Sequence, residues 1–157
     1  MKSAEVLKLV GAIGLCEGAG LFSSLFTTAS IATWYVALSK PSWTPPNWLF
    51  GPVWLSLYAL MGASLYLFAT SDEDGITVGL GVFGVQLLLN ILWSVVFFGY
   101  HFIDYGFYTI VALWVSILVM IWFFAKASKV AAVMLIPYIV WVTIAAALNF
   151  SILVLNG

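Results

Sequence analysis

Five long apolar stretches, separated by short polar or proline-rich breaks, dominate this sequence. Each is about as long as the roughly 20 residues that a helix needs to cross the hydrocarbon core of a bilayer. A backbone in that core must satisfy its own hydrogen bonds, so a helix is the expected structure for each stretch. The sequence therefore predicts an all-α integral membrane bundle of five transmembrane helices, forming one domain over residues 1–157. We expect the helices over about residues 6–31, 52–70, 76–98, 105–125 and 130–154.

The composition agrees with lipid as the solvent. Of the 157 residues, 64% are hydrophobic and 7% are charged, which leaves too little polar surface to cover a soluble globule. The apolar pattern after Lys8 runs on too long for a cleaved secretory signal, so we expect the first segment to be a retained helix.

Cysteine, arginine and histidine usage excludes several kinds of site. Cys16 is the only cysteine, so the chain alone can form neither a disulfide nor a cysteine-based metal site. There is no arginine and the five lysines are scattered, so nucleic acid is not an expected partner. His101 lies in a short loop without a second histidine, which predicts no metal centre.

Prolines and an acidic residue between the apolar stretches predict where loops and helix ends lie. Residues 34–52 hold four of the five prolines, which predicts a long loop whose tryptophans Trp34, Trp43 and Trp48 lie at the membrane interface. Asp104 is expected to cap the fourth helix, and Pro137 to interrupt the fifth.

Lysine placement predicts an orientation. With five helices, Lys2, Lys8, Lys126 and Lys129 share one side of the membrane, and the other side holds only Lys40. By the positive-inside rule, we expect the amino terminus to face the cytoplasm.

One stripe of the third helix should avoid lipid. Gln86, Asn90, Trp93 and Phe97 are spaced by four, three and four residues, so they share a helical face. Amides in hydrocarbon must face other helices or a polar ligand group, and both alternatives stay open here. The second helix repeats the pattern with Trp54, Tyr58 and Met61, and the fifth with Tyr138, Trp141, Ala145, Leu148 and Asn149.

Rings with a few neutral polar groups are what a flat apolar ligand needs, because stacking supplies affinity and one or two hydrogen bonds set orientation. The alternative for any single ring is ordinary packing. Glu17, in the first helix, is expected to be protonated and bonded to a neighbouring helix, with a proton relay as the alternative. Gly75 and Gly79 form a G-x-x-x-G motif that serves either a dimer seam or packing within the chain.

The resemblance to a known family covers nearly the whole chain. Residues 34–62 read W-Y-V-A-L-S-K-P-S-W-T-P-P-N-W-L-F-G-P-V-W-L-S-L-Y-A-L-M-G, residues 86–98 read Q-L-L-L-N-I-L-W-S-V-V-F-F, and residues 137–149 read P-Y-I-V-W-V-T-I-A-A-A-L-N. These motifs closely resemble the tryptophan-rich sensory protein family, TspO, whose mitochondrial relative is the translocator protein or peripheral benzodiazepine receptor. The resemblance implies five transmembrane helices and a homodimer. It also implies a pocket beneath the first loop that binds porphyrins and, in some members, sterols or benzodiazepine-type ligands.

By motif position, the resemblance implies that Trp54 and Trp141 line a porphyrin site, with porphyrin as a ligand and no intrinsic cofactor. It also implies a possible light- and oxygen-dependent porphyrin breakdown attributed to these two tryptophans. A sensing, sequestering or transport role is the first expectation, and an enzyme-like activity or a small-molecule transporter are the alternatives. The further candidate ligand-binding residues are Tyr35, Pro45, Pro46, Tyr58, Gln86, Asn90, Trp93, Tyr138, Ala145 and Leu148.

Two departures bear on the ligand. The residues after the fifth helix, 151–157, contain neither the tyrosine nor the basic residue of the sterol-recognition pattern of animal members. An arginine-free chain also lacks a strong permanent partner for porphyrin carboxylates, which leaves Lys40 or backbone donors as substitutes.

Overall fold

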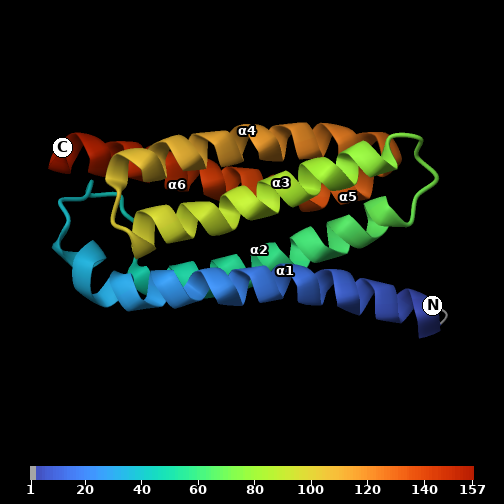
Figure 1. Ribbon diagram of the computed structural model, residues 1–157, viewed down its shortest axis with the longest axis horizontal. Helices are drawn as coiled ribbons and strands as arrows, with labels where there is room; N and C mark the ends of the chain where they lie inside the picture. Colours follow the sequence, from blue (N-terminus) through green and yellow to red (C-terminus); the bar gives the residue numbers. More distant parts are fainter. Residues whose placement is uncertain (1–2) are drawn as a thin grey trace.

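Helices account for every regular element in the computed structural model, which describes residues 3–157 (Figure 1). Lys2, one of the lysines in the orientation argument, lies outside the described residues. The elements in chain order are α1 (Ser3–Ser30), the π-helical turn η1 (Ile31–Tyr35), α2 (Asn47–Ala69), α3 (Ile76–Ser94), the π-helical turn η2 (Val95–Gly99), α4 (Ile103–Ala127), α5 (Lys129–Met134) and α6 (Ile136–Asn156).

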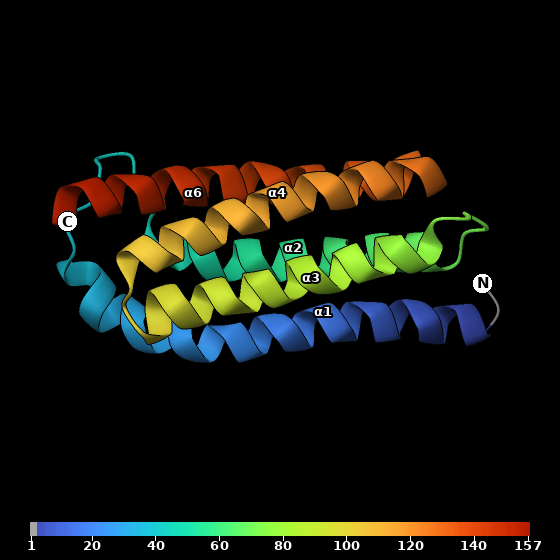
Figure 2. The same cartoon turned by 45° about the horizontal axis from the view of Figure 1, so that its top comes forward.

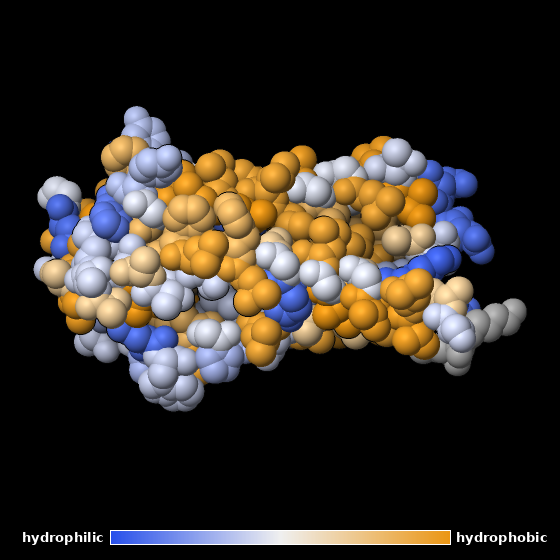
Figure 3. All heavy atoms as spheres, turned by 60° about the horizontal axis from the view of Figure 1, so that its bottom comes forward, coloured by the Kyte–Doolittle hydropathy of each residue, from blue (hydrophilic) through white to orange (hydrophobic). Residues whose placement is uncertain are grey.

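Five of the helical segments are long and apolar enough to cross a membrane, which confirms the predicted fold class. They are Ser3–Tyr35, Asn47–Ala69, Ile76–Gly99, Ile103–Ala127 and Lys129–Asn156. Figure 3 shows mainly apolar side chains over the middle of the molecule, where there is one hydrophilic patch, and further strongly hydrophilic residues toward both ends. This banding is what a chain that spans a bilayer requires.

The bundle has three levels (Figure 2). Helices α2 and α3 lie in the middle, α1 packs against both from one side, and α4 and α6 pack together on the other. The amino terminus and the turn between α2 and α3 lie at one end, and the first loop and the carboxyl terminus lie at the other (Figure 1). Lys40 therefore lies at the end opposite the amino terminus.

The loop between the first two spans is shorter than predicted. The first span continues through η1, so Trp34 and Tyr35 belong to the helix, and α2 begins at Asn47 rather than near Pro52. Pro52 is the sixth residue of α2, beyond the first turn, where N–H groups have no partner inside the helix. It therefore deprives one carbonyl, that of Trp48, of its donor, and the helix continues through it with that bond missing.

The two predictions about helix boundaries, a cap at Asp104 and an interruption at Pro137, had different outcomes. The prediction that Asp104 caps α4 was wrong: Phe102 is the N-cap residue and supplies no side-chain bond, and Asp104 lies in the first turn. A carboxylate there still favours the positive end of the helix dipole. The predicted interruption near Pro137 is confirmed, since the helix breaks at Leu135 and Pro137 occupies the first turn of α6.

Candidate functional site

A directed chain of hydrogen bonds joins three helices in the core. The Tyr58 hydroxyl donates to Asn90 Oδ1 at 2.6 Å, and Asn90 Nδ2 donates to the Tyr138 hydroxyl at 2.7 Å. That hydroxyl donates in turn to Gln86 Oε1 at 3.0 Å, and Gln86 Nε2 points at Met61 Sδ at 3.1 Å. All five side chains are buried. Of the two alternatives left open for the amides, interhelical hydrogen bonding is therefore observed, and a ligand role for them stays a prediction.

A cluster of aromatic rings lies beside this chain. The Trp54 ring lies 5.5 Å from that of Tyr58, 6.1 Å from that of Trp93 and 6.2 Å from that of Tyr138, measured between centroids. Trp93 is fixed in turn, because its indole nitrogen donates to Asn149 Oδ1 at 3.1 Å. The aromatic stripes of three spans thus meet in one core, as predicted.

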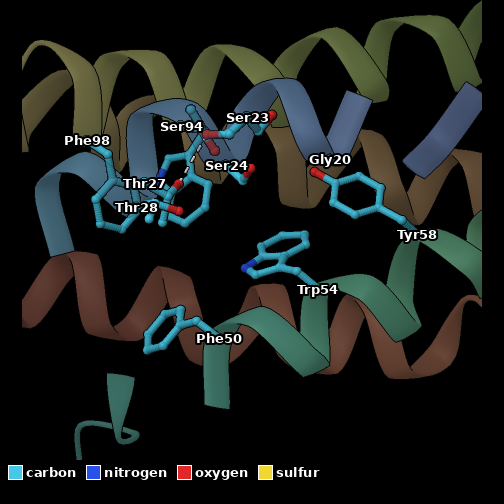
Figure 4. A pocket seen from close by; sticks show the side chains of 11 residues that line it. Gly20, Ser23, Ser24, Thr27, Thr28, Phe50, Trp54, Tyr58, Ser94 and Phe98 are labelled. Carbon is cyan, nitrogen blue, oxygen red and sulfur yellow. Dashed lines mark hydrogen bonds between the residues drawn. The ribbon is translucent and has the colours of Figure 1, made fainter. Parts of the chain in front are cut away.

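A small cavity opens between this cluster and α1 (Figure 4). Its volume is about 70 Å³. Phe50, Trp54 and Tyr58 extend toward it from α2, and hydroxyl-bearing residues of α1 face them (Figure 4). One wall is therefore aromatic and the other is hydroxylic. The lining residues are Gly20, Ser23, Ser24, Thr27, Thr28, Phe50, Trp54, Tyr58, Trp93, Ser94 and Phe98.

The α1 wall was not predicted as part of the site. Its residues recur at Gly20, Ser23, Ser24, Thr27 and Thr28, a helical spacing that places small polar side chains on one face. That periodicity was the available signal. Gly20 is needed for close approach, because a Cβ there would come within 2.5 Å of the Tyr58 ring.

The cavity contains some of the predicted ligand-binding residues and not others. Trp54, Tyr58 and Trp93 line it, whereas Trp141 does not. Trp141 packs against Phe50, with ring centroids 5.7 Å apart, and lines an outer groove between α2 and α6. Trp54 and Trp141, predicted to share one site, therefore line different hollows in this structure.

The remaining predicted residues lie deeper or outside. Gln86, Asn90 and Tyr138 form the hydrogen-bond chain behind the Trp54 ring, and Ala145 and Leu148 are buried in α6. Pro45 and Pro46 belong to the loop before α2. Tyr35, at the end of η1, is buried with its ring 6.3 Å from that of Phe50.

Comparisons with known proteins point to one family over most of the chain. The model of the TspO/MBR family matches residues 12–155. The chain belongs to the TspO/MBR family. It is 42% identical to a tryptophan-rich protein TspO of Chlorobaculum tepidum, over 97% of this chain and 98% of that one. It is 38% identical to the protein CrtK of Rhodobacter capsulatus, over 90% and 88% of the two chains, and 35% identical to the human translocator protein, over 88% and 84%.

In this TspO/MBR protein, Lys40 is already engaged by the backbone. Its Nζ donates to the carbonyl oxygens of Tyr35 at 2.6 Å, Leu38 at 2.9 Å and Val36 at 3.3 Å, and it lies 4.8 Å from the Tyr35 ring centroid. Partial burial lowers the pKa of the Lys40 ammonium. The ammonium therefore caps the end of the first span, and any ligand carboxylate would compete with these carbonyls.

Of the two glycines in the G-x-x-x-G motif, Gly79 serves packing within the TspO/MBR bundle. A Cβ on Gly79 would come within 2.3 Å of the Phe68 ring, so this glycine admits α2 against α3. Gly81 and Gly84 instead have nothing within 4 Å of an added Cβ. Glu17 is half-buried on α1 and, among residues 3–157, has neither a hydrogen bond nor an ion pair, so the predicted bond to a neighbouring helix is not seen.

Proposed function

We propose that this TspO/MBR membrane protein binds porphyrin-like tetrapyrroles and other flat apolar ligands at the cavity between α1, α2 and α3. The observation that carries the proposal is the asymmetry of the cavity, with the rings of Trp54 and Trp93 on one wall and the hydroxyls of α1 on the other. A flat ligand stacks on the first wall and is oriented by the second. Relatives named tryptophan-rich sensory protein and translocator protein support a sensing, sequestering or transport role.

The cavity must enlarge to admit such a ligand. Its volume of about 70 Å³ is well below the roughly 300–1,000 Å³ of pockets that hold drug-sized molecules. Helix α1 has one face on α2 and α3, and only Cys16, Ser23 and Ser30 are buried among its 28 residues. A shift of α1 relative to α2 and α3 is the enlargement that this proposal requires, because α1 supplies the hydroxyl-bearing wall of the cavity.

Saturable quenching of tryptophan fluorescence by protoporphyrin IX in lipid nanodiscs tests the proposal. Trp54→Phe should weaken the apparent affinity by about tenfold, or ~1.4 kcal/mol, because phenylalanine offers a smaller stacking face than the indole. Trp122→Phe is the matched control, because Trp122 lies exposed on α4. Non-saturable quenching of the wild-type protein, or equal losses in both variants, would contradict the proposal.

The same variants address the alternative activities. Porphyrin breakdown through Trp54 and Trp141 predicts light-dependent product that disappears when both are phenylalanine. Transport predicts porphyrin uptake into proteoliposomes that is reduced by Trp54→Phe and retained in Trp122→Phe. Neither activity follows from binding alone, so each is measured separately.

We further propose that the amino terminus faces the cytoplasm and that the protein is a homodimer. Lys8, Lys126 and Lys129 belong to the α1 amino-terminal end and the junction between α4 and α5, opposite Lys40, and this distribution supports the orientation. Single cysteines at Asp74 and Ser39, in a Cys16→Ala background, would be labelled from opposite sides by a membrane-impermeant maleimide. Labelling of position 74 from outside intact cells would overturn the orientation.

A further inference from the structure

His101 has a backbone conformation that few residues with a side chain adopt. Its φ is 60°, and among residues 3–157 no other residue has a positive φ. A left-handed conformation of this kind costs free energy, and it persists only where the surrounding structure holds it in place. The contacts of the His101 ring must therefore offset that cost.

The His101 ring contacts the end of the first span. It stacks on the indole of Trp34, with centroids 4.3 Å apart and an angle of 14° between the planes. Its Nε2 lies 3.1 Å from the hydroxyl oxygen of Ser30. Because the Ser30 hydroxyl donates its proton to the Phe98 carbonyl, it accepts from His101, which assigns a proton to Nε2. His101 thus holds the first span by one ring face and one hydrogen bond.

We call the four residues Ser30, Trp34, Phe98 and His101 the latch. They join α1 and η1 to η2 and to the connection before α4, at the end of the bundle that holds the first loop (Figure 1). Ser30 and Phe98 are buried, whereas His101 is exposed. The latch is therefore anchored in the core, and its outer member can swing into water without unfolding a helix.

The latch adjoins the cavity between α1, α2 and α3. Phe98 belongs to both, and Thr27, one turn before Ser30, lines the same end of the cavity from α1 (Figure 4). A shift of α1 away from the third span enlarges the cavity, and the latch ties these two elements together. The His101 ring must therefore release Trp34 and Ser30 before α1 can move at this end.

We propose that His101 latches the first span to the third, and that release of its ring sets the rate at which a ligand enters the cavity. This inference rests on the proposed binding function and adds to it a residue that regulates access. His101 is not among the residues that line the cavity, so it acts on entry and not through contact with a bound ligand.

Two substitutions open the latch from opposite sides. His101→Asn removes the ring but suits the backbone, because asparagine adopts the left-handed conformation more readily than most residues. Ser30→Ala removes the hydroxyl that the ring bonds. Tyr100→Asn is the matched control in the same connection, since the Tyr100 ring is exposed and stacks on Phe102.

The latch is tested first without a ligand. Ser94 is buried and lines the cavity. The reaction of Ser94→Cys with N-ethylmaleimide in lipid nanodiscs, in a Cys16→Ala background, therefore reports how often the cavity opens. Adding His101→Asn or Ser30→Ala should raise that rate by several-fold, whereas adding Tyr100→Asn should leave it unchanged.

A second cysteine separates opening of the latch from general loosening of the bundle. Ser64 is fully buried on α2, where its hydroxyl donates to the Ala131 carbonyl at 2.8 Å. The reaction rate of Ser64→Cys should be the same with and without His101→Asn. Equal rates at Ser94→Cys with and without the latch, or parallel increases at both cysteines, would overturn the latch.

Ligand entry is then followed by the rate at which protoporphyrin IX quenches tryptophan fluorescence. His101→Asn should associate several-fold faster than wild type, because the cavity is open more often, and Tyr100→Asn should associate at the wild-type rate. An unchanged association rate, with raised reactivity at Ser94→Cys, would overturn the control of entry. Wild-type protein that does not bind protoporphyrin IX would refute the proposed function, and the reactivity of Ser94→Cys would still decide whether the latch exists.

Discussion

Asn156 holds both backbone polar groups of Ser39, a residue 117 positions away. Its Oδ1 accepts from Ser39 N at 2.9 Å, and its Nδ2 donates to Ser39 O at 2.9 Å and to Ile152 O at 2.8 Å. The carboxyl-terminal end of the fifth span thereby fixes the loop between the first two spans. This loop precedes the turn of α2 that carries Phe50.

Replacing Asn156 with leucine should loosen that loop. Two interactions worth about 0.5–1.5 kcal/mol each are lost, so hydrogen exchange at the Ser39 amide should accelerate by about tenfold or more. Ser151→Ala is a suitable control, because the Ser151 hydroxyl bonds only within α6. Slow exchange at Ser39 in Asn156→Leu would show that the loop is held by other contacts.

Asn90→Leu should destabilise the bundle by about 1–3 kcal/mol, because it deprives the buried Tyr58 hydroxyl of its acceptor. The measurement is unfolding by denaturing detergent. In a Tyr58→Phe background the cost should shrink, which a double-mutant cycle detects. Additive losses would mean that the two side chains are not coupled.

Gly62→Ala should separate α1 from α2. The added Cβ would lie 2.4 Å from the Ile13 Cα, and backbone cannot yield as a flexible side chain does. Overpacking of this kind costs about 1–3 kcal/mol. Gly51→Ala in the same helix meets nothing within 4 Å and should be neutral in the same unfolding assay. A neutral Gly62→Ala would indicate that α1 shifts freely.

Gly84→Leu should weaken the proposed homodimer. Gly81, Gly84 and Leu88 share an outward face of α3 where small residues would let a second copy approach. The expected loss is about tenfold in dimerisation, read by energy transfer between labelled copies in lipid. Gly11→Leu, on the outer face of α1, should leave energy transfer unchanged. Equal dimerisation of Gly84→Leu and wild type would place the seam elsewhere.

The fold could be predicted because every span in lipid must be an apolar helix that satisfies its own backbone hydrogen bonds. Apolar length alone located the five helices, and polar residues on helical spacing, such as Gln86 and Asn90, correctly indicated faces turned from lipid. The helix start at Asn47 was missed because a proline was taken as the boundary, whereas α2 continues through Pro52 with one backbone hydrogen bond missing. The prediction that Asp104 caps α4 was wrong because an acidic residue is favourable both at the N-cap and in the first turn of a helix.

The arrangement of the site could be predicted only in part. Periodicity placed Trp54 and Trp141 on aromatic helix faces, but it did not show that Trp54 would line the cavity against α1 while Trp141 lines a groove between α2 and α6. That difference depends on how the side chains of neighbouring helices pack, which no single helix's spacing encodes. The serine and threonine face of α1 had the right spacing, yet hydroxyls that bond their own helix carry a weak signal in membrane spans.

The π-helical turns η1 and η2 lie against each other: Trp34 and Phe97 meet edge-on at 5.3 Å, and the Ser30 hydroxyl donates to the Phe98 carbonyl. Each such turn accommodates one residue beyond an ordinary α-helical turn. Deleting one residue from Ile31–Tyr35 would thus return this turn to an ordinary α-helical one and leave the residues on both sides of it facing as they do now. The same deletion within α1 would rotate every later residue of the span by roughly 100°, so at this end of the protein the wide turns are the places where a change of one residue in length is absorbed.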